Sequence, residues 1–263
     1  MQKNSFQQPA VRRVFITGAS SGIGEALAEY YAQQGAVLGL AGRNREKLQW
    51  LVENLPGEHA IYPADVRNAH EMQAAAQDFM ARFGIPDIVI ANAGVSCGTL
   101  TEMQEDIAAF QSVMETNVLG LVHTFQPFIT AMKAAKHGQL AGIASVAGLR
   151  GLPGAGAYSA SKAAAIAYLE SLRVEMLPLG VSVSTICPGY IRTPMTAVNP
   201  YPMPFLMDVN TAAKKIAGII QKKKRFAIFP WQMAILGRLM KLLPAAIWDW
   251  LAHRATHKPR SIL

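Results

Sequence analysis

The chain has 263 residues, of which 51% are apolar and 16% charged, and its formal net charge is +8. This composition excludes an intrinsically disordered chain, and the sequence shows neither a secretory signal in residues 1–13 nor an apolar run long enough to predict a membrane-spanning helix. The two cysteines, Cys97 and Cys187, match no metal-binding spacing and cannot form a disulfide framework, which indicates a reducing, cytoplasmic compartment.

Short apolar runs alternate with longer amphipathic stretches along most of the chain. The runs predicted as strands are residues 11–17, 37–41, 60–62, 88–91, 140–144, 181–186 and 226–229. These runs are too apolar for a sheet with one face in water, and helical patterns separate most of them. The alternation therefore predicts an α/β fold of the doubly wound type, in which helices cover both faces of a mainly parallel seven-stranded sheet.

A glycine-rich turn follows the first predicted strand. Residues 17–24 read Thr-Gly-Ala-Ser-Ser-Gly-Ile-Gly, and a helical pattern over residues 25–34 follows at once. Glycines let the backbone turn sharply and approach a pyrophosphate, whose charge then meets the free N–H groups of a helix N-terminus. The spacing is G-x-x-x-G-x-G rather than G-x-G-x-x-G, yet its place between strand and helix predicts a dinucleotide phosphate site over a plain structural turn.

The end of the second predicted strand indicates which dinucleotide binds. Many such sites place an acid there, about 20 residues beyond the turn, to hold the ribose 2′-hydroxyl. Here the strand is followed by Arg43, whose guanidinium suits a 2′-phosphate. The sequence therefore predicts NADP(H), with NAD(H) as the alternative; a solvated arginine at a helix start is the other interpretation.

Tyr158 lies thirteen residues after Ser145 and four before Lys162. Residues four apart share a helix face, so the Lys162 ammonium can favour phenolate and lower the Tyr158 pKa from about 10. A general acid that works near neutral pH requires such a shift. Ser145 ends the fifth predicted strand, where ligands of parallel sheets lie, so its hydroxyl can orient a carbonyl. An amphipathic helix with one snorkelling lysine is the alternative.

In this order the motifs resemble the short-chain dehydrogenase/reductase family, a Rossmann-type fold in its compact single-domain form, over residues 11–193. The resemblance adds the motifs Asp65-Val66, Asn92-Ala93-Gly94 and Pro188-Gly189, and it implies the catalytic set Asn117, Ser145, Tyr158 and Lys162. With the turn and Arg43, the expected cofactor-binding residues are Thr17, Gly18, Ser20, Ser21, Gly22, Ile23, Gly24, Arg43, Asp65, Val66, Asn92, Ala93, Gly94, Tyr158, Lys162, Pro188, Gly189, Ile191 and Thr193.

The resemblance also implies roles for these residues. Asp65 would accept the adenine amino group while Val66 packs on the ring, and Thr193 would hold the nicotinamide carboxamide. Tyr158 would protonate the carbonyl oxygen as NADPH delivers hydride. Lys162 would lower the Tyr158 pKa, bind the ribose hydroxyls and reach solvent through a water held by Asn117. A homo-oligomer, dimer or tetramer, would associate through the helices that carry Asn117 and Tyr158.

The sequence changes character after residue 193. Residues 194–207 contain four prolines and three methionines, a composition that resists regular structure and offers adaptable apolar surface. We expect a substrate lid over about residues 194–210. A lid of this kind predicts a hydrophobic substrate, such as a lipid-like, steroid-like or long-chain keto compound.

The C-terminal fifth carries the excess positive charge. Residues 214–263 hold eleven Lys or Arg and one acid, a local charge of +10, whereas the preceding residues sum to −2. Residues 231–263 predict a basic, amphipathic helical extension of the catalytic domain formed by residues 1–230. Its tryptophans and cations suit an anionic membrane surface; helices packed over the substrate cleft or against another subunit are the alternative.

Two other patterns predict no function. His253 and His257 lack the glutamate and third ligand of a zinc helix, so we expect no metal. The basic run at residues 222–225 suits a solvated helix end, without a nucleic-acid fold signature. A nucleotide-sensing protein without catalysis is the alternative to an enzyme, although the catalytic set is complete.

Overall fold

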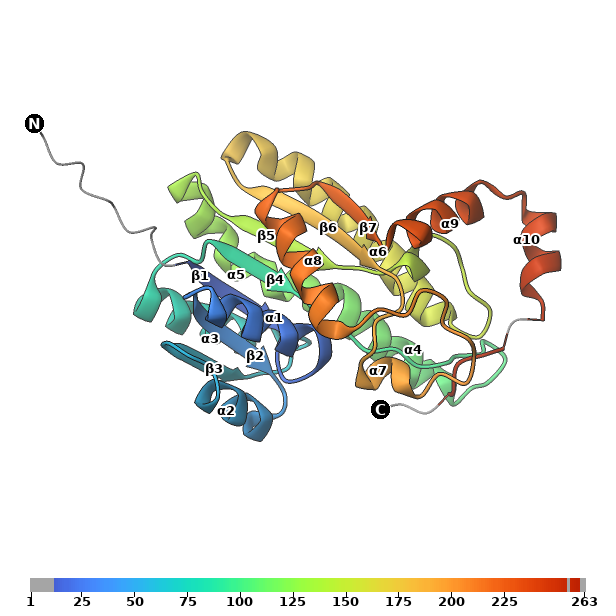
Figure 1. Cartoon of the computed structure of the whole chain (residues 1–263), viewed down its shortest axis with the longest axis horizontal. Helices are drawn as coiled ribbons and strands as arrows, with labels where there is room; N and C mark the ends of the chain where they lie inside the picture. The colour runs from blue at the N-terminus through green and yellow to red at the C-terminus, as the bar shows by residue number, and fades with distance from the viewer. Residues whose placement is uncertain (1–11, 255, 261–263) are drawn as a thin grey trace, which may run out of the picture.

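The sheet is central to the computed structural model, which describes residues 12–254 and 256–260. Every neighbouring pair of strands is parallel, in the order β3-β2-β1-β4-β5-β6-β7 (Figure 1). The strands are β1 (Arg13–Thr17), β2 (Val37–Gly42), β3 (His59–Pro63), β4 (Ile88–Ala91), β5 (Gln139–Ile143), β6 (Ser182–Pro188) and β7 (Phe226–Phe229). The predicted seven-stranded, doubly wound sheet is confirmed; residue 11, included in the first predicted strand, lies outside the described residues.

Helices cover both faces of the sheet. One face carries α1 (Gly22–Gln33), α2 (Arg45–Glu53) and α8 (Val209–Gln221). The other carries α3 (Ala69–Phe83), α5 (Gly120–Ala135) and α6 (Gly156–Met176), and α4 (Asp106–Met114) packs on α6. The helix predicted after the glycine turn is α1, and it begins at Gly22, inside the turn itself.

Alternate residues of each central strand enter opposite cores. Val14 and Ile16 of β1 belong to the core beneath α1 and α8, whereas Phe15 faces α3 and α5. Its ring lies 5.5 Å from that of Phe79 and 4.9 Å from that of Phe128, centroid to centroid. Each such buried side chain contributes about 1.5–3 kcal/mol of transfer free energy. Two cores thus hold the sheet rigid, which fixes where its carboxyl edge lies.

Side-chain caps set where three helices begin. Asn44 accepts the N–H of Lys47 at the start of α2, Asn68 accepts two N–H groups at the start of α3, and Asp208 does the same for α8. Each cap satisfies backbone donors that the first helical turn leaves free and stabilises the helix by about 1 kcal/mol. The loops that follow β2 and β3 are thereby held at the carboxyl edge.

The strand order places a crevice at that edge. From β1 the chain proceeds outward to β2 and β3, and it then returns to β4 on the other side of β1. The loops after β1 and β4 therefore leave the sheet in opposite directions, and ligands of doubly wound sheets bind at such a switch point.

The predicted lid contains more regular structure than its composition suggested. A short helix, α7 (Pro194–Ala197), begins it, because Pro194 suits a first helical position and Thr196 bonds the backbone N–H of Thr193 at 3.1 Å. Residues 198–208 are irregular apart from a bridge between Ile191 and Met207, and α8 begins at Val209, before the predicted end of the lid.

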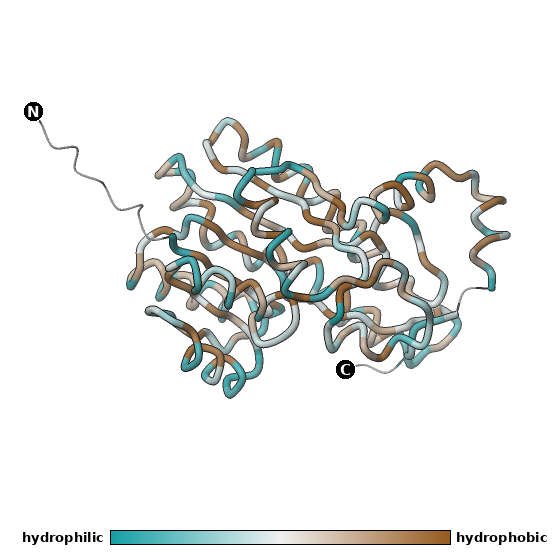
Figure 2. The backbone as a smooth tube through the Cα atoms, viewed as in Figure 1, coloured by the Kyte–Doolittle hydropathy of each residue, from teal (hydrophilic) through white to brown (hydrophobic). Residues whose placement is uncertain are grey.

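The predicted helical extension is confirmed as α9 (Trp231–Leu242) and α10 (Ala245–Ala252). These helices project beyond the end of the sheet, and α10 stands farthest out (Figure 1). Figure 2 shows hydrophobic residues along most of α9. Across residues 12–254 and 256–260, no helix combines the length and apolar character needed to cross a bilayer.

Candidate active site

A cleft of about 650 Å³ at the carboxyl edge brings most of the predicted site residues together. This volume lies in the usual range of small-molecule sites. The predicted residues that line it are Gly18, Ser20, Ser21, Gly22, Ile23, Arg43, Asp65, Val66, Asn92, Ala93, Gly94, Ser145, Tyr158, Lys162, Pro188, Gly189, Ile191 and Thr193. Thr17, Gly24 and Asn117 are buried outside this lining, so their contributions are indirect.

The glycine turn is compact because two of its glycines cannot carry a side chain. Gly18 has a φ of +66°, a left-handed conformation that glycine adopts without strain. A Cβ on Gly24 would collide with the carbonyl oxygen of Gly18. The turn therefore lies close against the start of α1, and the helix presents its free N–H groups beside the cleft.

Asn92 braces this turn from β4. Its side-chain amide donates to the carbonyl oxygens of Thr17 and Gly18, at 3.0 and 3.2 Å, and its backbone N–H reaches the Thr17 hydroxyl at 3.2 Å. The sequence predicted only that small residues at positions 92–94 let the chain pass close to a cofactor. The structure adds a positioning role, in which Asn92 locks the end of β1 to the end of β4.

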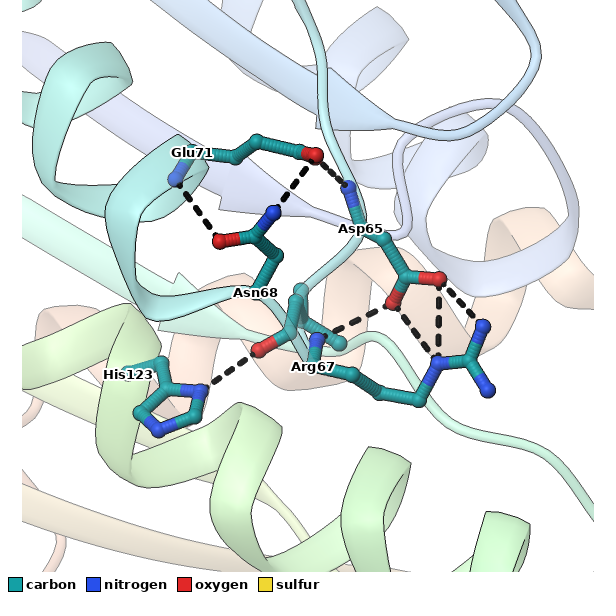
Figure 3. Close-up of polar contacts among 6 residues, drawn as sticks. Asp65, Arg67, Asn68, Glu71 and His123 are labelled. Carbon is teal, nitrogen blue, oxygen red and sulfur yellow. Dashed lines mark hydrogen bonds and ion pairs between the residues drawn. The ribbon is translucent and has the colours of Figure 1, made fainter.

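Two arginines lie near the end of the cleft that carries Asp65, and one of them, Arg43, lines it. Arg43 is exposed after β2, and its binding to a 2′-phosphate stays a prediction. Asp65 is bound by Arg67, with one guanidinium nitrogen 2.7 Å from its carboxylate (Figure 3). The bonds from Arg67 hold the pKa of Asp65 below its usual range, with a smaller contribution from Arg43. Asp65 is therefore ionised and oriented, and sequence reasoning missed Arg67, which stands two residues along the chain.

Polar contacts fix the loop that carries Asp65 and Val66. Glu71 accepts the Asp65 N–H at 2.8 Å, and Asn68 donates to the same glutamate (Figure 3). On the other side, the ring of His123, from α5, bonds the Val66 carbonyl oxygen at 2.9 Å. The loop is therefore held between α3 and α5.

Asn117 lies in a π-helical turn, Glu115–Leu119, between α4 and α5. Its side-chain oxygen accepts the Val95 N–H at 2.8 Å, and its amide donates to the Val95 carbonyl and to the Ser161 hydroxyl. Both amide protons are thus used. The structure gives the side chain a positioning role that ties the loop after β4 to α6, whereas the predicted water relay stays a prediction.

Ser145 and Tyr158 meet across the cleft from different elements. Ser145 follows β5, and its hydroxyl accepts the Ala147 N–H at 3.1 Å; Tyr158 lies in the first turn of α6. Burial raises the pKa of the Tyr158 phenol, and a hydrogen bond with Ser145 opposes the rise. The phenol is therefore protonated at neutral pH, which a proton donor requires.

The direction of this pKa shift is opposite to the sequence prediction, which expected Lys162 to lower it. The Lys162 ammonium lies 5.8 Å from the centre of the Tyr158 ring and donates instead to the Ile143 carbonyl oxygen at 3.0 Å. Burial lowers the pKa of Lys162 to about 8, which further weakens its effect on the phenol. In this structure desolvation therefore outweighs the attraction between phenolate and ammonium.

The cleft beside the predicted lid includes residues to which the sequence assigned no individual role. Met195 and Thr196 line the cleft from α7, and the rings of Tyr190 and Tyr201 lie 6.4 Å apart. Thr193 is the N-cap residue of α7 and also lines the cleft, so it is both a helix-cap threonine and a wall residue. The methionine-rich composition indicated the lid, but no local pattern marked Tyr190.

Comparison with known proteins gives a consistent result. A family described as short chain dehydrogenase matches residues 12–201. An uncharacterized oxidoreductase of Myxococcus xanthus (strain DK1622) is 37% identical over 246 residues, which are 92% of this chain and 97% of the relative. The 11-beta-hydroxysteroid dehydrogenase-like 3 protein of Arabidopsis thaliana is 34% identical over 226 residues, covering 82% and 72% of the two chains.

Solved structures share the fold. Levodione reductase aligns with a TM-score of 0.75 and 24% identity, over 85% of this chain and 98% of its own. A 3-ketoacyl-(acyl-carrier-protein) reductase from Brucella melitensis, complexed with NADH, aligns with a TM-score of 0.76 and 23% identity, over 82% and 94%. At these identities the likeness establishes the sheet and its helices, and no more.

Proposed function

This chain belongs to the short-chain dehydrogenase/reductase family, and from that membership we propose that it interconverts a hydrophobic ketone and its secondary alcohol with NADP(H). Membership makes the chain an oxidoreductase with a nucleotide-binding fold. One observation carries the finer proposal: Ser145, Tyr158 and Lys162 line the same cleft as the glycine turn and Arg43.

The residues present fit a nicotinamide dinucleotide. The turn closed by Gly18 and Gly24 leaves backbone N–H groups free for a pyrophosphate, and a side chain at Gly24 would collide with the turn itself. Arg43 is the group we assign to the 2′-phosphate, because an exposed guanidinium gains a charge-assisted bond only when that phosphate is present. NAD(H) is the alternative, to be distinguished by the ratio of activities with the two cofactors.

Each catalytic side chain has one task in this reaction. NADPH, when bound, supplies the hydride to the carbonyl carbon. The Ser145 hydroxyl orients the carbonyl oxygen, and Tyr158 gives its phenolic proton to that oxygen, so that full negative charge never develops there. Lys162, one helical turn from Tyr158, stabilises the phenolate that remains. In the oxidative direction the same phenolate removes the proton of the alcohol.

The substrate is proposed to be hydrophobic because apolar side chains contribute to the lining of the cleft beside the predicted lid. Val95, Ile191 and Met195 line it, and the Tyr190 and Tyr201 rings pair nearby. Methionine side chains adapt to irregular apolar shapes. The steroid-dehydrogenase-like name of the Arabidopsis relative adds support for a lipid-like or steroid-like carbonyl.

The proposal is tested by NADPH oxidation over a panel of carbonyl compounds. We expect turnover of lipid-like, steroid-like or long-chain ketones and little turnover of small charged or sugar ketones. Tyr158→Phe should abolish turnover and keep NADPH binding, measured by cofactor fluorescence. Turnover confined to small charged ketones refutes the hydrophobic substrate, and undiminished turnover by Tyr158→Phe refutes the mechanism.

We further propose that the chain self-associates as a dimer or tetramer through α4, α5 and α6. Ile107 and Phe110 of α4 and Val174 of α6 are large apolar side chains exposed to solvent, with exposed fractions of 63%, 42% and 60%. Light scattering coupled to gel filtration measures the mass. A monomer at micromolar concentration contradicts this part of the proposal.

The helices α9 and α10, here called the arm (residues 231–252), are proposed to bind an anionic membrane surface from the cytoplasmic side. Eight of the seventeen large apolar side chains that are exposed among the described residues lie in the arm. Exposed Arg238 and Lys241 stand among them on α9. Apolar rings and cations together suit a lipid headgroup layer, whereas a second copy would bring like charges together.

A further inference from the structure

The last described residues, 256–260, return from the arm to lie against three segments around the substrate side of the cleft. In Figure 1 this end of the chain runs back from α10 past α4 toward α7. The backbone N–H of Gly98, in the loop after β4, donates to the Pro259 carbonyl oxygen at 2.8 Å. His257 lies against Gly154 in the loop before α6, and Lys258 reaches α7. One short segment thus touches the β4–α4 loop, the β5–α6 loop and the lid helix.

Lys258 connects two walls of the cleft. Its ammonium donates to the Ser96 hydroxyl at 3.1 Å and to the Met195 carbonyl oxygen at 3.3 Å, while only 8% of the residue is exposed. Ser96 adjoins Val95, which lines the cleft, and Met195 lines it directly. Both partners are neutral, and burial lowers the Lys258 pKa. Burying a charged ammonium against neutral partners costs free energy. Its two hydrogen bonds join the loop after β4 to α7 and thereby fix the separation between them.

Arg260 anchors the segment at its outer end. Its guanidinium makes two bonds to Asp106, at 2.9 and 3.1 Å, and one to Glu105 at 2.8 Å. The Asp106 side chain is 7% exposed and also accepts the Leu100 N–H at 2.8 Å. Paired, bidentate bonds to a buried carboxylate are stronger than an ordinary surface ion pair. Arg260 therefore holds the segment to the start of α4.

The body of the enzyme is shaped to receive this segment. A Cβ on Gly98 would collide with the Lys258 carbonyl oxygen, and a Cβ on Gly154 would collide with the His257 ring. Both glycines belong to loops beside the cleft, and both leave space that the C-terminal residues fill. Gly98 thus leaves room for the Lys258 backbone, and Gly154 leaves room for the His257 ring.

We propose that residues 256–260 form an outer wall that lies behind the lining of the substrate site, and that Lys258 and Arg260 determine which carbonyl compounds fit by holding Val95 and Met195 at a fixed separation. The inference rests on the proposed function, since it concerns the substrate of that reaction. Lys258 and Arg260 are positioning residues that do not touch the reacting atoms. Lys258 acts through Met195 and the loop that carries Val95, and Arg260 acts by anchoring the segment to α4.

The test compares Lys258→Met and Arg260→Gln with wild type on a chain-length series of ketones. Releasing the wall should raise the KM for substrate and change the ratio of kcat/KM between long and short ketones by about tenfold or more, because each methylene in an apolar pocket discriminates to that extent. The NADPH dissociation constant should change less than twofold, as the segment has no contact with the glycine turn. Lys215→Met on α8 and Arg225→Gln before β7 are exposed controls that should match wild type.

A second readout, hydrogen exchange, needs no substrate. In both variants the peptides that contain Gly98 and Met195 should exchange faster, while the remainder of the sheet is unchanged. Faster exchange with an unaltered chain-length ratio overturns the inference, because the segment would then be only a brace. A wild-type protein without turnover refutes the proposed reaction, whereas unchanged exchange at both peptides in both variants overturns the inference by itself.

Discussion

Lys162 directs its ammonium to the backbone oxygen of Ile143, 3.0 Å away, and is 5% exposed. A neutral carbonyl compensates only part of the lost hydration of a charge. Burial accordingly lowers the pKa of Lys162 from 10.5 to about 8. The folded state therefore bears a free-energy cost for burying the Lys162 ammonium, and Lys162 is a residue that the proposed reaction requires.

The first prediction concerns stability. Between pH 8 and 10.5 the unfolded chain binds more protons at Lys162 than the folded chain, so stability rises with pH through this window, and below it the folded protein bears the whole cost. The shift corresponds to about 3 kcal/mol. Lys162→Met should therefore unfold at higher urea concentration than wild type at pH 7 while losing activity, and the gain should shrink toward pH 10.5. Lys215→Met is the exposed control, and a Lys162→Met protein less stable than wild type at pH 7 contradicts the prediction.

The second prediction concerns pH and direction. Because burial raises the Tyr158 pKa, the protonated phenol that reduction needs persists through the neutral range, and the phenolate that oxidation needs forms only at alkaline pH. Ketone reduction should stay level from about pH 6 to 8, and alcohol oxidation should rise steeply above it. Initial rates in both directions measure this. An oxidation rate already level near neutral pH would show that Tyr158 ionises earlier, as the sequence had predicted.

Sequence reasoning reached most of the fold because its signals are local. Apolar strand runs, the glycine turn and the Tyr158–Lys162 spacing each lie within a few residues, and sheet geometry then brings them to one edge. The direction of the Tyr158 pKa was missed because it depends on burial and on Ile143, contacts that no spacing encodes. Asp65 was assigned without its partner Arg67, since two opposite charges two residues apart in a loop do not by themselves indicate that they pair.

The C-terminal segment was beyond sequence reasoning for a different reason. Lys258 and Arg260 stand in a basic tail, where cations are usually solvated. Their partners Ser96 and Asp106 lie more than 150 residues away along the chain, at sequence separations of 162 and 154. The sequence left a membrane contact, a cover over the cleft and a subunit contact as alternatives. In the structure residues 256–260 lie beside the cleft, and α9 and α10 extend beyond the end of the sheet (Figure 1).

The third prediction concerns cofactor choice. Arg43→Gln removes the charge that we assign to the 2′-phosphate, and charged hydrogen bonds contribute about 1.5–3 kcal/mol. The kcat/KM for NADPH should fall by about tenfold to a hundredfold, while that for NADH changes little. Steady-state rates with each cofactor, at one ketone concentration, measure the ratio. Equal losses with both cofactors would mean that Arg43 acts elsewhere on the dinucleotide.

The fourth prediction concerns the brace beneath the turn. Asn92→Ala leaves the Thr17 and Gly18 carbonyl oxygens without their amide donors, which costs about 1–3 kcal/mol when such groups are buried. We expect a lower unfolding free energy and about tenfold weaker NADPH binding, with the substrate KM unchanged at saturating cofactor. Calorimetric titration with NADPH checks the binding. Asn54→Ala, which removes an exposed bond on α2, is the control.

The last prediction concerns the arm. Trp231 and Trp250 are 68% and 72% exposed, and each ring that enters a headgroup layer removes apolar area from water at about 25 cal/mol per Å². The double variant Trp231→Ser, Trp250→Ser should lose most co-flotation with vesicles that contain anionic lipid, at low salt. Trp50→Ser, at a 57% exposed tryptophan on α2, should float like wild type. If wild type fails to float, the membrane proposal is wrong. A change of oligomeric mass in the arm variant, with flotation unchanged, would instead show that the arm binds a second copy.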